Sequence, residues 1–119
     1  MLFHKSRLVA GTKSGRFVIW RLDFDEGVLR LINIVEAHKN GITRLKLMLG
    51  CIVSVSEDTY MRIWNDEFEE HFSYKFADVI TDVVLARDNA GQQVLLTSNM
   101  TGTIQIYNVD QGVERNGVL

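Results

Sequence analysis

Three polar residues in the middle of the chain are of types that can do chemistry together. His38, Ser56 and Asp58 are the residue types of a Ser–His–Asp system, in which histidine accepts the proton of a serine nucleophile and aspartate orients the histidine. Such a system also needs an open pocket and donors for an oxyanion, and no feature of the sequence marks either of these. The same residues could instead form a structural hydrogen-bond chain, because a half-buried histidine needs partners for both ring nitrogens.

Short apolar runs of strand length surround these residues. The ranges 43–48, 51–56, 60–64 and 71–76 are predicted strands joined by tight turns. Several runs do not alternate between polar and apolar residues, as Phe17-Val18-Ile19-Trp20 shows. Such runs are typical of strands that are covered on both faces, so the sequence favours sheets stacked face to face.

The pattern recurs on both sides of the middle stretch, and an aromatic residue marks each copy. Trp20 precedes Trp64 by 44 residues, and Tyr107 follows Trp64 by 43. The position five residues before each aromatic is a predicted turn residue: Gly15, Thr59 and Gly102. A period of about 40–45 residues with this internal order is the signature of a propeller blade.

The middle repeat resembles the tryptophan–aspartate (WD) repeat of β-propellers. That repeat opens with a Gly-His-like pair and closes about 26 residues later with Trp-Asp or a near variant. Here the two pairs are Ala37-His38 and Trp64-Asn65, and 26 residues separate His38 from Trp64. The resemblance covers nearly the whole chain. It implies an all-β fold, a partial WD-repeat β-propeller of about three four-stranded antiparallel blades.

The resemblance also implies a structural role for the polar residues. In WD repeats an aspartate, a histidine, a serine and a tryptophan form a hydrogen-bond chain, and the matching residues here are Asp58, His38, Ser56 and Trp64. We therefore expect this tetrad to specify the fold rather than to catalyse a reaction. The third repeat has Ala77-Asp78 where the histidine would stand, so the flanking repeats should lack the network.

The expected blades form one partial propeller over residues 1–119, at 7–35, 41–76 and 80–119. We expect the first blade to lack its innermost strand, because little chain precedes residue 7. A poor fourth strand of the third blade is expected near 112–119. Three blades cannot close a ring where about 4–8 are usual, and an open array leaves apolar faces and strand edges in water. Copies of the chain, another chain, or further blades of a longer propeller should therefore complete the ring.

The two loop faces of such a propeller differ in their residues. The resemblance implies that proteins or peptides bind one face, to which these residues map: Lys13, Lys39, Asn40, Glu57, Val79 and Met100. Exposed apolar tips such as Val79 and Met100 favour contacts, although ordinary loop residues remain an equal alternative. The opposite face forms an acidic rim: Asp23, Asp25, Glu26, Asp66, Glu67, Glu69, Glu70 and Asp110. This rim is either a solvated surface or a docking surface for a basic partner.

Composition narrows the classes of function. A formal charge of −2 gives no basic field for nucleic acid, and the apolar runs are too short for a membrane helix. The single Cys51 cannot form an internal disulfide, which fits a reducing compartment. No residues have metal-ligand spacing, and no phosphate-binding loop is present. We expect no cofactor, no metal, no nucleic acid partner, no membrane insertion and a cytoplasmic location.

The leading functional prediction is a protein–protein interaction scaffold or assembly subunit without catalysis. One alternative is an enzyme that uses His38 and Asp58 as reactive groups. Another is a reader of small ligands or modified peptides that binds near these residues or in a central channel completed by other blades. Because function resides in sites rather than in folds, the geometry of the His38 region has to decide among them.

Overall fold

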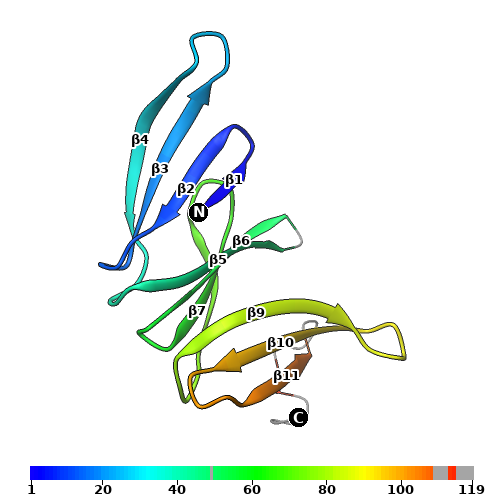
Figure 1. Ribbon diagram of the computed structural model, residues 1–119. Coiled ribbons are helices and arrows are strands. Elements are labelled where there is room, and N and C mark those ends of the chain that lie inside the picture. The colour runs from blue at the N-terminus through cyan, green and yellow to red at the C-terminus, as the bar shows by residue number, and fades with distance from the viewer. Residues whose placement is uncertain (49, 109–112, 115–119) are drawn as a thin grey trace.

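The computed structural model describes residues 1–48, 50–108 and 113–114, which form three antiparallel sheets of four strands each (Figure 1). The first sheet contains β1 (Leu2–His4), β2 (Arg7–Gly11), β3 (Arg16–Asp23) and β4 (Val28–Glu36). The second contains β5 (Ile42–Met48), β6 (Cys51–Ser56), β7 (Tyr60–Trp64) and β8 (Glu70–Lys75). The third contains β9 (Ile80–Arg87), β10 (Gln93–Asn99), β11 (Ile104–Asn108) and β12 (Val113–Glu114). Within each sheet the strands pair in chain order, so the sheets are three successive blades.

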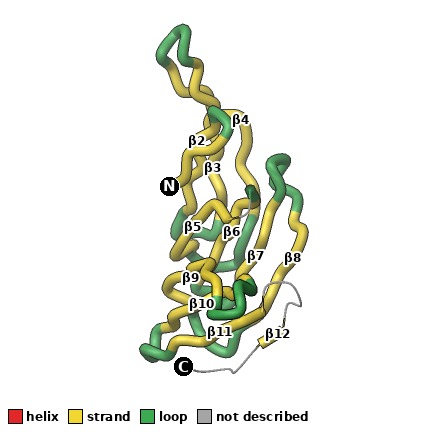
Figure 2. Tube along the Cα trace, turned by 90° about the vertical axis from the view of Figure 1, so that its right-hand side faces the viewer, coloured by secondary structure: helices red, strands yellow, loops and turns green. Residues whose placement is uncertain are grey.

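The blades follow one another along the molecule and pack face to face (Figure 2). On the side of the first blade, Ile52 and Trp64 of the second blade share a core with Phe17. On the side of the third blade, Val53 and Val55 belong to a second core. Successive residues of β6 therefore point to opposite neighbours and are buried on both faces, which explains why the apolar runs do not alternate.

The expectation that the first blade lacks its innermost strand is wrong. Strand β1 pairs with β2, with Leu2 opposite Val9 and His4 opposite Arg7. The turn between them is made by Lys5 and Ser6, which have φ angles of 51° and 63°. Two positive φ angles make a tight hairpin turn, so few residues suffice for the extra strand. A Lys-Ser pair does not indicate such a turn in a sequence, whereas Asn-Gly would.

The described part of the last strand of the third blade is two residues long. Strand β12 pairs Val113 with Asn108 and Glu114 with Tyr107. The remainder of the predicted strand near 112–119 and the acidic residue Asp110 lie outside the described residues.

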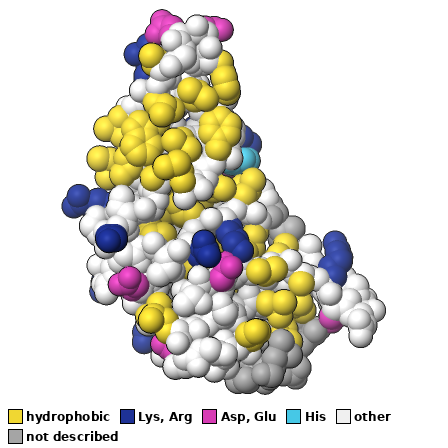
Figure 3. All heavy atoms as spheres, viewed as in Figure 1, with side chains coloured by type: hydrophobic (Ala, Val, Ile, Leu, Met, Phe, Trp, Pro, Cys, Tyr) yellow, Lys and Arg dark blue, Asp and Glu magenta, His cyan; other side chains and the backbone are white. Residues whose placement is uncertain are grey.

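The outer face of the first blade is apolar and exposed. Trp20 lies opposite Leu31, and Val18 lies opposite Ile34, so their side chains share the face that points away from the second blade. Hydrophobic side chains gather over this sheet in the space-filling view (Figure 3). Leu31 and Ile34 are more than half exposed, at 58% and 51%. No other blade covers this face in the described chain.

Candidate functional site

The loop that joins the first and second blades positions His38. The amides of Ala37 and His38 both donate to the carbonyl of Gly15, at 3.1 and 2.8 Å. Gly15 has a φ of 86°, and a Cβ there would lie 2.1 Å from the carbonyl oxygen of His38. Only glycine fits this close approach of two backbones. The β2–β3 turn thus fixes the loop before β5, so that the imidazole of His38 points into the face of the second blade.

A continuous hydrogen-bond chain runs from the carboxylate of Asp58 to the indole of Trp64. The Nδ1 of His38 lies 2.9 Å from Asp58 Oδ2, and its Nε2 lies 2.7 Å from the Oγ of Ser54. The indole Nε1–H of Trp64 donates to the same Oγ at 2.9 Å. The side chains of His38 and Asp58 are 0% and 5% exposed. The structure therefore brings His38, Asp58 and Trp64 together in a buried network.

The serine of this chain is Ser54 and not Ser56, which corrects the assignment implied by the resemblance. In the hairpin register Ile52 lies opposite Trp64, so Ser54 is the nearest serine on the same face. Ser56 lies one step further along β6. Its Oγ donates to the carbonyl of Asn40 at 3.0 Å and accepts from the amide of Asp58 at 3.0 Å. The register of β6 against β7, counted outward from the turn between them, shows which of the two serines lies nearer the indole of Trp64.

The network assigns the proton positions of His38. Ser54 accepts from Trp64, so its single O–H is free to donate to Nε2 of His38. The Nδ1–H then donates to Asp58, which fixes the neutral tautomer. Burial holds the pKa of His38 below its ordinary value, although Asp58 acts in the opposite direction. Burial opposes the charge of Asp58, but hydrogen bonds from the amides of Tyr60 and Lys39 and from His38 keep the pKa of Asp58 below its ordinary value.

Acid is expected to destabilise the fold through these two groups. The unfolded chain protonates histidine near pH 6.5, above the lowered pKa of folded His38, so this stability is present above about pH 6.5 and is lost as the pH falls through the folded pKa. Asp58 adds a second loss below about pH 4. The urea midpoint should be lower at about pH 5.5 than at about pH 7.5, with a smaller difference in His38→Gln. A midpoint that does not change, or that rises on acidification, would contradict this tautomer.

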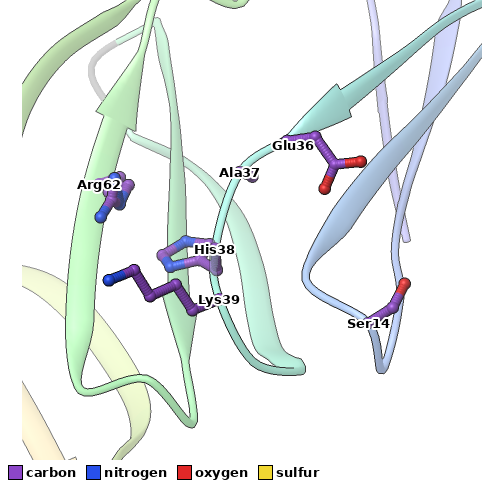
Figure 4. A pocket seen from close by; sticks show the side chains of 6 residues that line it. All are labelled: Ser14, Glu36, Ala37, His38, Lys39 and Arg62. Carbon is purple, nitrogen blue, oxygen red and sulfur yellow. The ribbon is translucent and has the colours of Figure 1, made fainter.

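A hollow of about 440 Å³ opens beside the network, between the first two blades (Figure 4). Its lining residues are Ser14, Glu36, Ala37, His38, Lys39 and Arg62. The Nε of Arg62 is buried and has no hydrogen-bond partner within the described residues. In the described part of the chain, the serine hydroxyl that contacts His38 is that of Ser54, which is fully buried and already engaged with Trp64. The hollow therefore offers cationic donors, while the hydroxyl beside the imidazole is closed to a substrate.

The residues predicted to form a binding face lie in loops at one end of the blades. Lys13 is in the β2–β3 turn, Lys39 and Asn40 are in the loop before β5, and Glu57 is in the β6–β7 turn. The amide of Glu57 donates to the carbonyl of Gly41 at 2.9 Å, which joins that turn to the loop. In the third blade the amide of Met100 donates to the carbonyl of Val79 at 3.1 Å. Met100 is 68% exposed, whereas Val79 is half-buried.

The acidic rim is partly paired within the chain. Asp66 of the β7–β8 loop contacts the residues in and beside the β1–β2 turn. Its carboxylate lies 3.2 Å from the Nε2 of His4 and pairs with the Nζ of Lys5. The backbone carbonyl of Asp66 accepts a hydrogen bond from the Nη1 of Arg7. These contacts clamp the first blade to the second, and no sequence pattern indicated them. The ion pair with Lys5 holds the pKa of Asp66 below its ordinary value. Two further rim residues pair within one blade: Glu26 with Arg30 at 2.6 Å, and Glu70 with Arg62 at 3.3 Å.

The rest of the rim has local contacts or faces solvent. Asp23 accepts from the amides of Asp25 and Glu26, and Glu69 accepts from the side-chain amide of Asn65. Glu67 is exposed. Within residues 1–48, 50–108 and 113–114, no group of histidine, cysteine, aspartate and glutamate side chains has the geometry to hold a metal ion. The same part of the chain contains no helix long and apolar enough to cross a bilayer.

Comparison with known proteins identifies the fold. No family model matches the sequence, and no curated protein matches it. A chain in the crystal structure of the mitotic checkpoint complex matches with a TM-score of 0.69 over 94% of this chain. That neighbour is a β-propeller. The present chain is a partial β-propeller. The neighbour is 15% identical in sequence, and this chain spans about a third of its length, 36%. The predicted fold class, three four-stranded antiparallel blades, is therefore confirmed.

Proposed function

We propose that this partial propeller is a protein–protein interaction scaffold or assembly subunit, built from WD repeats and without catalysis. The observation that carries the proposal is the loop face, where exposed Met100 and exposed Lys39 stand on turns fixed by backbone hydrogen bonds. Binding residues are commonly loop residues held by a rigid sheet. An exposed methionine beside polar groups suits contact with a peptide, because its thioether adapts to irregular apolar surfaces.

The hydrogen-bond chain supports the WD-repeat part of this proposal. Aspartate, histidine, serine and tryptophan occur in the order that the resemblance implies, with Ser54 as the serine. The sequence runs Glu57-Asp58-Thr59 and Ile63-Trp64, preceded by Ala37-His38, lead us to propose a similarity to the C-terminal blades of WD repeat-containing protein 54. We propose kinship with those blades.

An exposed apolar sheet face supports the proposal of protein partners. The exposed apolar face of the first blade favours completion of the propeller by copies of the chain or by another chain. A formal charge of −2 argues against nucleic acid as a partner. The lone Cys51 fits a cytoplasmic location, which we propose for the chain on its own or within a larger complex.

The strongest alternative is a reader of modified peptides at the hollow between the first two blades. Arg62 and Lys39 line the hollow, and their cationic side chains suit an acidic or modified side chain of a peptide. An enzyme that uses His38 and Asp58 is less well supported, since burial leaves neither group open to a substrate. Loss of peptide binding in Arg62→Lys with retention in Met100→Lys would favour the reader.

Selection of peptides from a displayed random library tests the proposed loop face. We expect Met100→Lys to weaken binding of the selected peptides about tenfold or more, because it removes an exposed apolar contact from the face. Phe24→Lys is the matched control, since Phe24 is also 68% exposed but lies in the β3–β4 turn at the opposite end of the blades. Equal affinities for wild type and Met100→Lys would exclude this face as the binding surface.

A further inference from the structure

Each blade carries an aromatic residue near the end of its third strand, on the face that meets the preceding blade. The ring of Trp64 packs edge-on against Phe17 of the first blade at 5.2 Å. The ring of Tyr107 packs edge-on against Phe76, which precedes the third blade, at 5.4 Å. Trp64 and Tyr107 are nearly fully buried by these contacts. Trp20 holds the equivalent position in the first blade, where no preceding blade is present in the described chain.

The sheet face around Trp20 is apolar, like the faces that are buried between blades. We call it the Trp20 face: Phe3, Leu8, Val18, Trp20, Leu29, Leu31 and Ile34. Strand pairing places these residues on one side of the sheet. Phe3, Leu29, Leu31 and Ile34 are each at least half exposed. Monomeric soluble proteins rarely expose a contiguous apolar patch of this kind, and a patch on a sheet favours another sheet as its cover.

The third blade exposes a complementary face at the other end of the array. We call it the Ile104 face: Val84, Leu96, Ile104 and Ile106. Leu96 lies opposite both Val84 and Ile106, so the four side chains share the side that points away from the second blade. Val84 and Ile104 are each 45% exposed.

The Ile104 face repeats the residues that cover the aromatic positions inside the chain. Phe17 and Ile19 lie three and one residues before Trp20, and they are fully buried in the core that contains Trp64. Ile104 and Ile106 lie three and one residues before Tyr107. Ile104 and Ile106 therefore hold the positions in the third blade that Phe17 and Ile19 hold in the first. From these positions they can pack against the aromatic residue of a following blade. The aromatic residue that lacks a cover in the described chain is Trp20.

We propose that two copies of this chain associate head to tail, with the Ile104 face of each copy on the Trp20 face of the other. Two copies of three blades give six, which lies within the range of about 4–8 blades that close a ring. Such contacts join different surfaces and generate a closed ring when the rotation between copies completes a turn. The pairing rests on the proposed interaction function and extends it, because ring closure sets the loop faces of both copies side by side.

Mass measurement by light scattering and native mass spectrometry tests the pairing without any peptide, so its failure is separate from failure of the loop-face proposal. We expect a particle of twice the chain mass of 13.6 kDa at micromolar concentration. Leu31→Glu and Val84→Lys should each shift the protein toward monomer at least tenfold, because each places a charge in one of the two apolar faces. Phe72→Lys, at an exposed apolar position of the middle blade, should remain dimeric. Circular dichroism checks that every variant is folded.

Mixing the Leu31→Glu and Val84→Lys variants tests the head-to-tail direction. A mixed pair has one contact made of unaltered faces and a second contact in which the introduced glutamate meets the introduced lysine, so a mixed dimer should form. A monomeric wild type would overturn the proposal. A wild-type dimer that survives both substitutions, or variants that fail to form a mixed dimer, would also overturn it.

Discussion

Replacing His38 by alanine is expected to lower the free energy of unfolding by about 3 kcal/mol. The substitution removes the partner of Ser54 Oγ and one partner of Asp58, and both groups are buried. A buried polar group without a partner keeps its desolvation cost but loses the compensating hydrogen bond. The substitution also leaves a void against the face of the second blade. Urea unfolding followed by tryptophan fluorescence measures the change.

His71→Ala is the matched control for this prediction. His71 is exposed on β8, so its removal should change the stability by less than about 0.5 kcal/mol. Ser54→Ala should be clearly destabilising, because it leaves the imidazole of His38 and the indole of Trp64 without their hydrogen-bond partner. If His38→Ala proves as stable as His71→Ala and loses a hydrolytic activity that the wild type has, the residue serves catalysis and the structural account is wrong.

Gly15→Ala is expected to destabilise the protein by about 3 kcal/mol or more. The added Cβ would lie 2.1 Å from the carbonyl oxygen of His38 and 2.7 Å from that of Asn40, and both are backbone atoms. The β2–β3 turn would have to separate from the loop before β5, which would break the two hydrogen bonds to the Gly15 carbonyl. The first two blades should then lose their connection at this end. Thermal unfolding of the purified variant measures the loss.

Gly102→Ala separates the steric effect from the cost of backbone conformation. Gly102 holds the same turn position in the third blade with a φ of 85°, close to the 86° of Gly15, but a Cβ there would meet nothing within 4 Å. Only the cost of a positive φ remains, about 1 kcal/mol. Equal losses in the two variants would show that the close approach at Gly15 does not matter. Thr59 has a φ of 74° at the third equivalent position, so the positive φ of this turn position is compatible with a side chain.

The repeated aromatic spacing carried the fold prediction. Trp20, Trp64 and Tyr107 each end the apolar part of a third strand, and the strand periodicity around them is local information that a sequence contains. The innermost strand of the first blade was missed, because its turn depends on positive φ angles at Lys5 and Ser6. That conformation is stabilised in part by contacts with Asp66, which lies about sixty residues away.

The site could be predicted in its residue types but not in its register. His38, Asp58 and Trp64 occupy the expected loop, turn and strand, while the choice between Ser54 and Ser56 depends on which serine faces the indole across β6 and β7. The blade-to-blade clamp at Asp66 joins residues that share no local pattern. Tertiary packing alone brings such groups together, so no window of sequence could indicate them.

A double-mutant cycle between Phe17 and Trp64 tests most directly the claim that separate blades stack through these aromatic residues. The two rings belong to different blades and meet at 5.2 Å with an interplanar angle of 73°. Stabilities of Phe17→Leu, Trp64→Leu and the double variant should yield a coupling free energy of about 1 kcal/mol, as expected for an edge-to-face pair in contact. Additive effects within about 0.3 kcal/mol would show that the rings do not touch, and would contradict the stacked-blade account.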